Sequence, residues 1–119
     1  MPETVCVDRE HNVILIDSRD DVGETDLMKS LESVLQIVRD RGLNKVIVDT
    51  THQTSLPSTV ALYRFASELS KQARDLEHAI VATGQLPEEM RFIETVGQNR
   101  GVNIHLFSSR DEALAWLNR

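Results

Sequence analysis

The sequence predicts one α/β domain, residues 1–119, in which a mixed, mostly parallel five-stranded sheet packs against four helices. Two observations lead to this prediction. First, the β-branched apolar runs at residues 12–17, 45–49 and 78–84 are typical of buried strands. Second, segments with helical periodicity separate these runs, and strands that are joined through a helix pair in parallel. The predicted order of elements is β-β-α-β-α-β-α-β-α.

The outer strands are predicted from a turn and from an alternating pattern. Residues 4–8 are joined to residues 12–17 through the polar turn at residues 9–12, which favours an antiparallel hairpin. The last strand, residues 102–107, alternates apolar and polar side chains, as a strand with one buried face does. Its half-polar sequence suggests a sheet edge, where a second copy of the chain could pair to form a homodimer.

Capping residues mark the ends of the helices. Thr25 is the expected N-cap of the first helix, and Gly42 is its expected end because glycine adopts the left-handed conformation that stops a helix. Ser58 is the expected N-cap of the second helix, and Ser109 with Glu112 forms an expected capping box before the last one. The predicted helices cover residues 26–41, 59–75, 87–100 and 112–117.

The apolar residues also predict what is buried. The continuous runs at residues 46–48 and 79–82 should be interior strands that are covered by helices on at least one face. Trp116 should be packed against the sheet by the last helix. The single cysteine, Cys6, excludes an internal disulfide and is expected as a small buried side chain in the first strand.

Composition and charge exclude several classes of function. The 19 acidic and 13 basic residues give a net charge of -6, which disfavours a nucleic-acid partner because the phosphate backbone attracts clustered Lys and Arg. No run approaches the ~20 apolar residues of a membrane span. The first residues also lack the basic and apolar segments of a signal peptide. The sequence therefore predicts a cytoplasmic protein without membrane insertion.

The residues that carry chemistry in enzymes are scattered. The four histidines do not have the spacing of a helical metal pair, and the five glycines occur singly rather than in a phosphate-binding loop. No nucleophile and base can be paired from the sequence. We therefore expect no metal, no cofactor and no enzymatic activity.

The candidate binding surface lies where the parallel strands end, because open α/β sheets meet their ligands outside the carboxyl ends of the strands. The longest connection, residues 50–57, is predicted to be a polar loop at this end, and such loops often carry function. Many of these residues could equally serve as turn formers and helix caps. The candidate residues are Asp49, Thr50, Thr51, His52, Gln53 and Thr83.

Three segments give the chain a resemblance to a known family. These are the VIVD strand at residues 46–49 with the loop and helix that follow it, the ETVGQNRG run at residues 94–101, and the ending from Phe107 through residues 111–117. Together they resemble STAS-like domains, especially the small bacterial proteins described as anti-sigma factor antagonist-like or STAS/Sec14-like. The resemblance implies a non-enzymatic regulatory module that binds a protein partner.

In the STAS family, a partner kinase phosphorylates a serine or threonine at the start of the second helix. The matching run here is Pro57-Ser58-Thr59-Val60, so the resemblance implies Ser58 and Thr59 as phospho-acceptor candidates. Proline and valine stand where the family has aspartate and glycine. Ser58 has a structural alternative as a helix N-cap.

Two further classes of function were weighed. A phospho-accepting receiver domain would need another strand and helix between the acids near residue 17 and Asp49, and a Lys after the last strand, where this chain has Ser108 and Ser109. The alternative function is that of a small-molecule or lipid carrier, which the resemblance to STAS/Sec14-like proteins implies. A chain this short, with few aromatic residues, would have difficulty enclosing a large apolar ligand.

Overall fold

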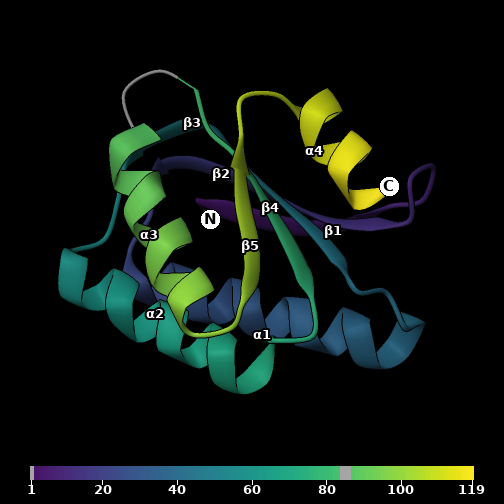
Figure 1. Cartoon of the computed structure of the whole chain (residues 1–119), viewed down its shortest axis with the longest axis horizontal. Helices are drawn as coiled ribbons and strands as arrows, with labels where there is room; N and C mark the ends of the chain where they lie inside the picture. Colours follow the sequence, from purple (N-terminus) through teal and green to yellow (C-terminus); the bar gives the residue numbers. More distant parts are fainter. Residues whose placement is uncertain (1, 84–86) are drawn as a thin grey trace.

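The computed structural model describes residues 2–83 and 87–119, which form the nine elements of the predicted order (Figure 1). The helices separate strands that run in the same direction, and only the first two strands are joined by a short turn. The elements are β1 (Glu3–Asp8), β2 (Val13–Asp21), α1 (Glu24–Arg41), β3 (Lys45–Ser55), α2 (Thr59–Gln72), β4 (Glu77–Val81), α3 (Pro87–Asn99), β5 (Asn103–Phe107) and α4 (Arg110–Leu117).

The strands form one sheet in the order β1-β2-β3-β4-β5. β1 pairs with β2 in antiparallel register, and the other three pairings are parallel. This confirms the predicted hairpin and the mixed, mostly parallel sheet. The apolar runs at residues 46–48 and 79–82 belong to β3 and β4, so they are interior strands as predicted.

The helices are divided unequally between the two faces of the sheet (Figure 1). α1, α2 and α3 cover one face, where residues such as Leu31, Leu62 and Ile93 pack on even-numbered apolar side chains of β2 to β5. α4 alone covers the other face over β3, β4 and β5, through Ala113 and Leu117. On this second face, Val13 and Leu15 of β2 join the apolar cluster under α4, and among the described residues no helix lies over β1.

This unequal cover explains why the prediction for Cys6 was wrong. Cys6 is exposed, although it lies in β1 as expected. Its side chain points to the face of the hairpin that α4 does not reach, and its neighbour on the same face, Thr4, is exposed too. Strand residues alternate between faces, so only the odd-numbered residues of β1 face α1.

The helix ends follow the predicted caps with two differences. Ser58 caps α2 and Ser109 caps α4, each accepting a backbone N–H bond, and Gly42 ends α1 with φ +70°. α1 begins two residues earlier than expected, with Gly23 rather than Thr25 at the N-cap, and the Gly23 N–H donates to the Asp26 carboxylate. In the predicted capping box, the Glu112 carboxylate would accept the backbone N–H of Ser109. It accepts the hydroxyls of Ser108 and Ser109 instead.

Candidate functional site

The segment predicted as a polar loop, residues 50–57, is largely a strand. β3 continues to Ser55, and β2 continues to Asp21 beside it, with two irregularities in the register. Beyond the Asp49–Val81 pair, β4 no longer accompanies β3. The two polar strand ends therefore form a two-stranded extension at the carboxyl edge of the sheet. The prediction failed because polar residues rich in threonine can continue a strand once a neighbouring strand supplies hydrogen bonds.

This extension separates the candidate residues between two sides. Thr50 and Gln53 are buried on the side of the helices, where the Thr50 hydroxyl donates to the Val81 carbonyl and the Gln53 amide donates to the Ser55 carbonyl. Thr51 and His52 are exposed, as is Thr83 after β4. The structure therefore does not bring the six predicted residues together into one site.

Asp49 joins the sheet to the last helix. Its carboxylate accepts the backbone N–H of Thr51 at 2.9 Å and the Thr51 hydroxyl at 2.5 Å, and the Arg110 guanidinium lies 2.6 Å from its other oxygen. Burial raises the pKa of Asp49, but these hydrogen bonds and the positive charge of Arg110 outweigh it, so the pKa lies below the ordinary value of 3.8. Asp49 is only 7% exposed, so its first role is to tie α4 to β3.

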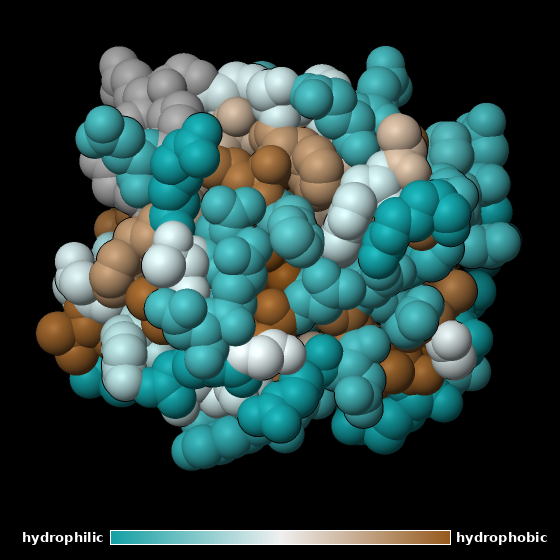
Figure 2. All heavy atoms as spheres, viewed as in Figure 1, coloured by the Kyte–Doolittle hydropathy of each residue, from teal (hydrophilic) through white to brown (hydrophobic). Residues whose placement is uncertain are grey.

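The start of α2 is the most accessible of the predicted sites. The Ser58 hydroxyl accepts the Ala61 backbone N–H at 3.2 Å, which confirms it as the N-cap, and both Ser58 and Thr59 are exposed. Directly after them, Val60 is 61% exposed and Tyr63 is 49% exposed. We call these four residues the α2 patch. Figure 2 shows apolar atoms among hydrophilic ones at the edge of the molecule over the start of α2.

Sequence reasoning missed the apolar half of the α2 patch. The buried face of α2 carries residues such as Leu62, Ala66 and Leu69, and Val60 and Tyr63 fall outside that face. The signal in the sequence was that these two apolar residues depart from the helical period of the buried face, which indicates exposed apolar side chains. Tyr63 is held by the guanidinium of Arg100, which lies 4.4 Å from the centre of its ring and also donates to its hydroxyl.

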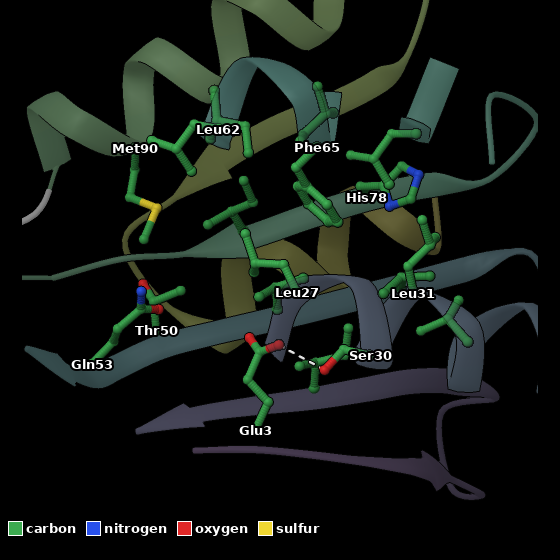
Figure 3. A pocket seen from close by; sticks show the side chains of 18 of the residues that line it. Glu3, Leu27, Ser30, Leu31, Thr50, Gln53, Leu62, Phe65, His78 and Met90 are labelled. Atoms are coloured by element: carbon green, nitrogen blue, oxygen red, sulfur yellow. Dashed lines mark hydrogen bonds between the residues drawn. The ribbon is translucent and has the colours of Figure 1, made fainter. Parts of the chain in front are cut away.

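A cavity of about 80 Å³ lies between the sheet and the three helices that cover it (Figure 3). Its wall is mostly apolar, and the polar residues in it have partners within the protein, such as the Ala73 carbonyl 3.1 Å from His78 Nε2. Burial lowers the pKa of His78, against the opposing effect of that carbonyl, so the ring is neutral at pH 7. Pockets for drug-sized ligands measure about 300–1,000 Å³, so the cavity is much smaller than a typical lipid-sized pocket.

Among the described residues, Glu3 is the one acidic side chain in the wall of this cavity. It is 6% exposed, and its carboxylate accepts the Ser18 hydroxyl at 2.5 Å and the Ser30 hydroxyl at 2.6 Å. Figure 3 shows it turned from β1 toward Ser30 of α1. Burial raises the pKa of Glu3, and the two serine hydroxyls counteract part of that rise. No local pattern in the sequence indicates this cluster, because its members come from β1, β2 and α1.

Two classes of site have no counterpart within residues 2–83 and 87–119. No group of three His, Cys, Asp or Glu side chains there is placed to hold a metal ion. None of the helices in the same part of the chain is both long and apolar enough to cross a membrane.

Neither a protein-family model nor a curated protein matches this chain in sequence. Solved structures do match its fold. An uncharacterized DUF3478-family protein with a SpoIIAA-like fold from Shewanella loihica PV-4 has a TM-score of 0.64 at 18% identity, over 97% of this chain and 91% of that one. An anti-sigma factor antagonist from Mycobacterium paratuberculosis has a TM-score of 0.63 at 19% identity, over 98% and 95% of the two chains.

A third similar structure is the anti-sigma factor antagonist SpoIIAA in its unphosphorylated form. Its TM-score is 0.62 at 10% identity, over 98% of this chain and 97% of that one. All three comparisons extend over nearly the whole of both chains. The sheet order, the parallel pairings and the four helices agree with this likeness. The chain therefore has the STAS-like, SpoIIAA-like fold that its sequence predicts.

Proposed function

We propose that this domain is a non-enzymatic regulatory module that binds a protein partner through the α2 patch. The observation that carries the proposal is the exposure of two hydroxyls, Ser58 and Thr59, directly beside two exposed apolar side chains, Val60 and Tyr63. Exposed apolar side chains next to polar ones are typical of protein contact surfaces, and Tyr is enriched at their energetic centres. Two of the structures with this fold are anti-sigma factor antagonists, which supports a regulatory role.

The partner's contact area extends along the carboxyl edge of the sheet. Thr51, His52 and Thr83 are exposed at the same end of the strands from which α2 starts. Their side chains are short or planar and polar, so they can form the rim of a contact whose centre is Val60 and Tyr63. Asp49 is excluded from this area because its carboxylate is occupied by Thr51 and Arg110.

Phosphorylation of Ser58 or Thr59 would regulate this contact. A phosphate at Ser58 lies at the positive end of the α2 dipole, so the helix itself tolerates the new charge. The same charge lies beside Val60, where it would have to be dehydrated in an apolar contact, and this weakens binding. One structure with this fold is a phosphorylated form of SpoIIAA, and this supports the proposal by analogy of fold.

Binding variants test the patch against a matched control. The chain is tagged and isolated from its own cells, and bound proteins are identified by mass spectrometry. Ser58→Asp should abolish binding of the specific partner, whereas Ser58→Ala should retain it at a cost of about 1 kcal/mol in stability through the lost cap. Ser109→Asp is the control, because it replaces an N-cap serine in the same way at α4, on the other face of the sheet.

The apolar half of the patch is tested separately. Val60→Asp should abolish binding without loss of stability, since the side chain is exposed. A partner that binds Ser58→Asp, Val60→Asp and the wild-type chain equally would refute the α2 patch as the contact surface. Mass spectrometry of the isolated protein that finds no phosphate on Ser58 or Thr59 under several growth conditions would refute phosphorylation but leave constitutive binding intact.

A further inference from the structure

The two edges of the sheet differ in how their backbone groups are used. At β5, the outward-facing Leu106 N–H donates to the Glu94 carboxylate at 2.5 Å, and the Ile104 carbonyl accepts from the Gln98 amide at 2.8 Å. Both acceptor and donor side chains come from α3, which lies against β5. They occupy two of the outward-facing groups that an added strand would need. The expected self-association through residues 102–107 is therefore unsupported by the structure.

The β1 edge has open backbone groups. The Arg19 N–H donates to the Pro2 carbonyl, so in this antiparallel pair the even-numbered residues of β1 direct their backbone groups toward β2. The N–H and C=O groups of Glu3, Val5 and Val7 consequently point away from the sheet. Within residues 2–83 and 87–119, no side chain or backbone group bonds to them.

β1 also lacks several of the devices that usually protect an edge. It contains no lysine and no bulge, and its six-residue register with β2 is uninterrupted. The carboxylate of Glu3 points inward to Ser18 and Ser30 instead of along the edge. Pro2 precedes the strand and leaves the outward groups of Glu3, Val5 and Val7 untouched. The edge is therefore a template for an added strand.

We propose that a second copy of this chain occupies the β1 edge, with the two β1 strands antiparallel about a two-fold axis at Val5. Only this register uses all three outward-facing residues of each strand. In it, Val5 pairs with Val5 of the second copy, and Glu3 pairs with Val7 of the second copy. The five strands of each copy become one continuous sheet. The inference concerns the β1 edge of the sheet and does not rest on the proposed function.

The side chains of this register are compatible with a dimer. On the face without a helix, Thr4 lies opposite Cys6 of the second copy, so a polar residue and a small one meet and no like charges oppose each other. The partly buried Val5 side chains meet at the axis and bury the apolar surface that each monomer leaves open. The blocked β5 edge prevents the assembly from growing further, so pairing closes at two copies.

Charge substitutions at exposed positions test the surface without disturbing the core. The wild-type chain should sediment or scatter with about twice the monomer mass of 13.5 kDa at high protein concentration. The double variant Thr4→Lys/Cys6→Lys places like charges directly opposite across the axis and should raise the dimer dissociation constant by about tenfold or more. The matched variant Thr4→Lys/Cys6→Glu places opposite charges there and should remain a dimer.

A disulfide test fixes the register. In the proposed pairing, Thr4 of one copy lies opposite Cys6 of the other in a non-hydrogen-bonded pair. The Cα atoms of such a pair are about 4.5 Å apart, which is within disulfide reach. Mild oxidation of Thr4→Cys should therefore give a covalent dimer, whereas the wild-type chain and Thr4→Cys/Cys6→Ser should not. A wild-type chain that stays at monomer mass at every concentration would overturn the proposal, as would a dimer that the Lys/Lys variant leaves unchanged.

Discussion

The Arg110 guanidinium, at the first residue of α4, lies 2.6 Å from the carboxylate of Asp49 in β3, 61 residues away in the sequence. This pair is a polar link between the sheet and α4 on its second face. Thr51 holds the other carboxylate oxygen. The carboxylate thus has partners on both sides and orients α4 over the strands.

The Asp49 pair predicts a loss of stability on substitution. Asp49→Asn removes the charge that Arg110 contacts and should lower the free energy of unfolding by about 1–3 kcal/mol in urea melts at pH 7. Because the pKa of Asp49 is depressed in the folded state, its ionised carboxylate stabilises the fold at pH values above the ordinary pKa of 3.8. This stabilisation is lost as the pH falls through the folded-state pKa. The difference between wild type and Asp49→Asn should therefore shrink in acid. A constant difference from pH 7 to pH 3 would contradict the pKa assignment.

The Glu3 cluster predicts the opposite dependence on pH. The folded-state pKa of Glu3 is raised, so the contribution of Glu3 to the free energy of unfolding is present at pH values below the ordinary pKa of 4.5. This contribution is lost as the pH rises through the folded-state pKa. Glu3→Gln cannot ionise, so its free energy of unfolding relative to wild type should improve between acid and neutral pH. Ser30→Ala is the comparison variant, since it removes one hydroxyl from the carboxylate and should cost about 1–3 kcal/mol at pH 7. Parallel curves for wild type and Glu3→Gln would refute the raised pKa.

Leu117 should matter more to stability than Trp116. Leu117 is 1% exposed and anchors α4, so Leu117→Ala should cost about 2–5 kcal/mol. The Trp116 ring is only partly buried, between His105 and Phe107 on one side and Arg119 on the other, so Trp116→Ala should cost about 1–2 kcal/mol. Urea melts of both variants show which substitution lowers the free energy of unfolding more. A reversed order would mean that the aromatic stack, rather than the buried leucine, holds α4.

Gly97 should not tolerate alanine. A Cβ at this position would lie 2.7 Å from the Ile104 Cγ2 atom, because α3 packs closely on β5 there. Gly97→Ala should therefore lose about 1–3 kcal/mol through overpacking, more than the ~1 kcal/mol gained in helix propensity. In an Ile104→Ala background the contact is absent, and Gly97→Ala should become neutral or stabilising. Additive effects in this double-mutant cycle would show that the contact is not responsible.

Local residue patterns predicted most of the fold. The β-branched runs identified the interior strands β3 and β4, and Gly42, Ser58 and Ser109 marked helix ends where the structure has them. The extension of β3 through residues 50–55 was wrongly predicted as a loop, since its stability comes from pairing with the end of β2 rather than from its own composition. Pairing between polar segments leaves no periodic signal in one sequence.

The candidate site was predicted less well than the fold. Ser58 was identified correctly as an exposed N-cap, because a cap depends on neighbours in sequence. Asp49 was chosen as a binding residue, but the partner that occupies it is Arg110, and nothing in the sequence links residues 61 positions apart. The same holds for Glu3, whose hydroxyl partners lie 15 and 27 residues away.

The one-sided support of the β3 extension has a consequence for local opening. Residues 45–49 of β3 lie between two strands, whereas its end, up to Ser55, is paired with β2 alone. Segments with fewer hydrogen-bonded neighbours open at a free energy well below that of global unfolding. The amide hydrogens of residues 52–55 should therefore exchange with solvent faster than those of residues 46–49. Because this segment leads directly into Ser58, binding of the proposed partner at the α2 patch would act on a local equilibrium, while the centre of the sheet stays closed.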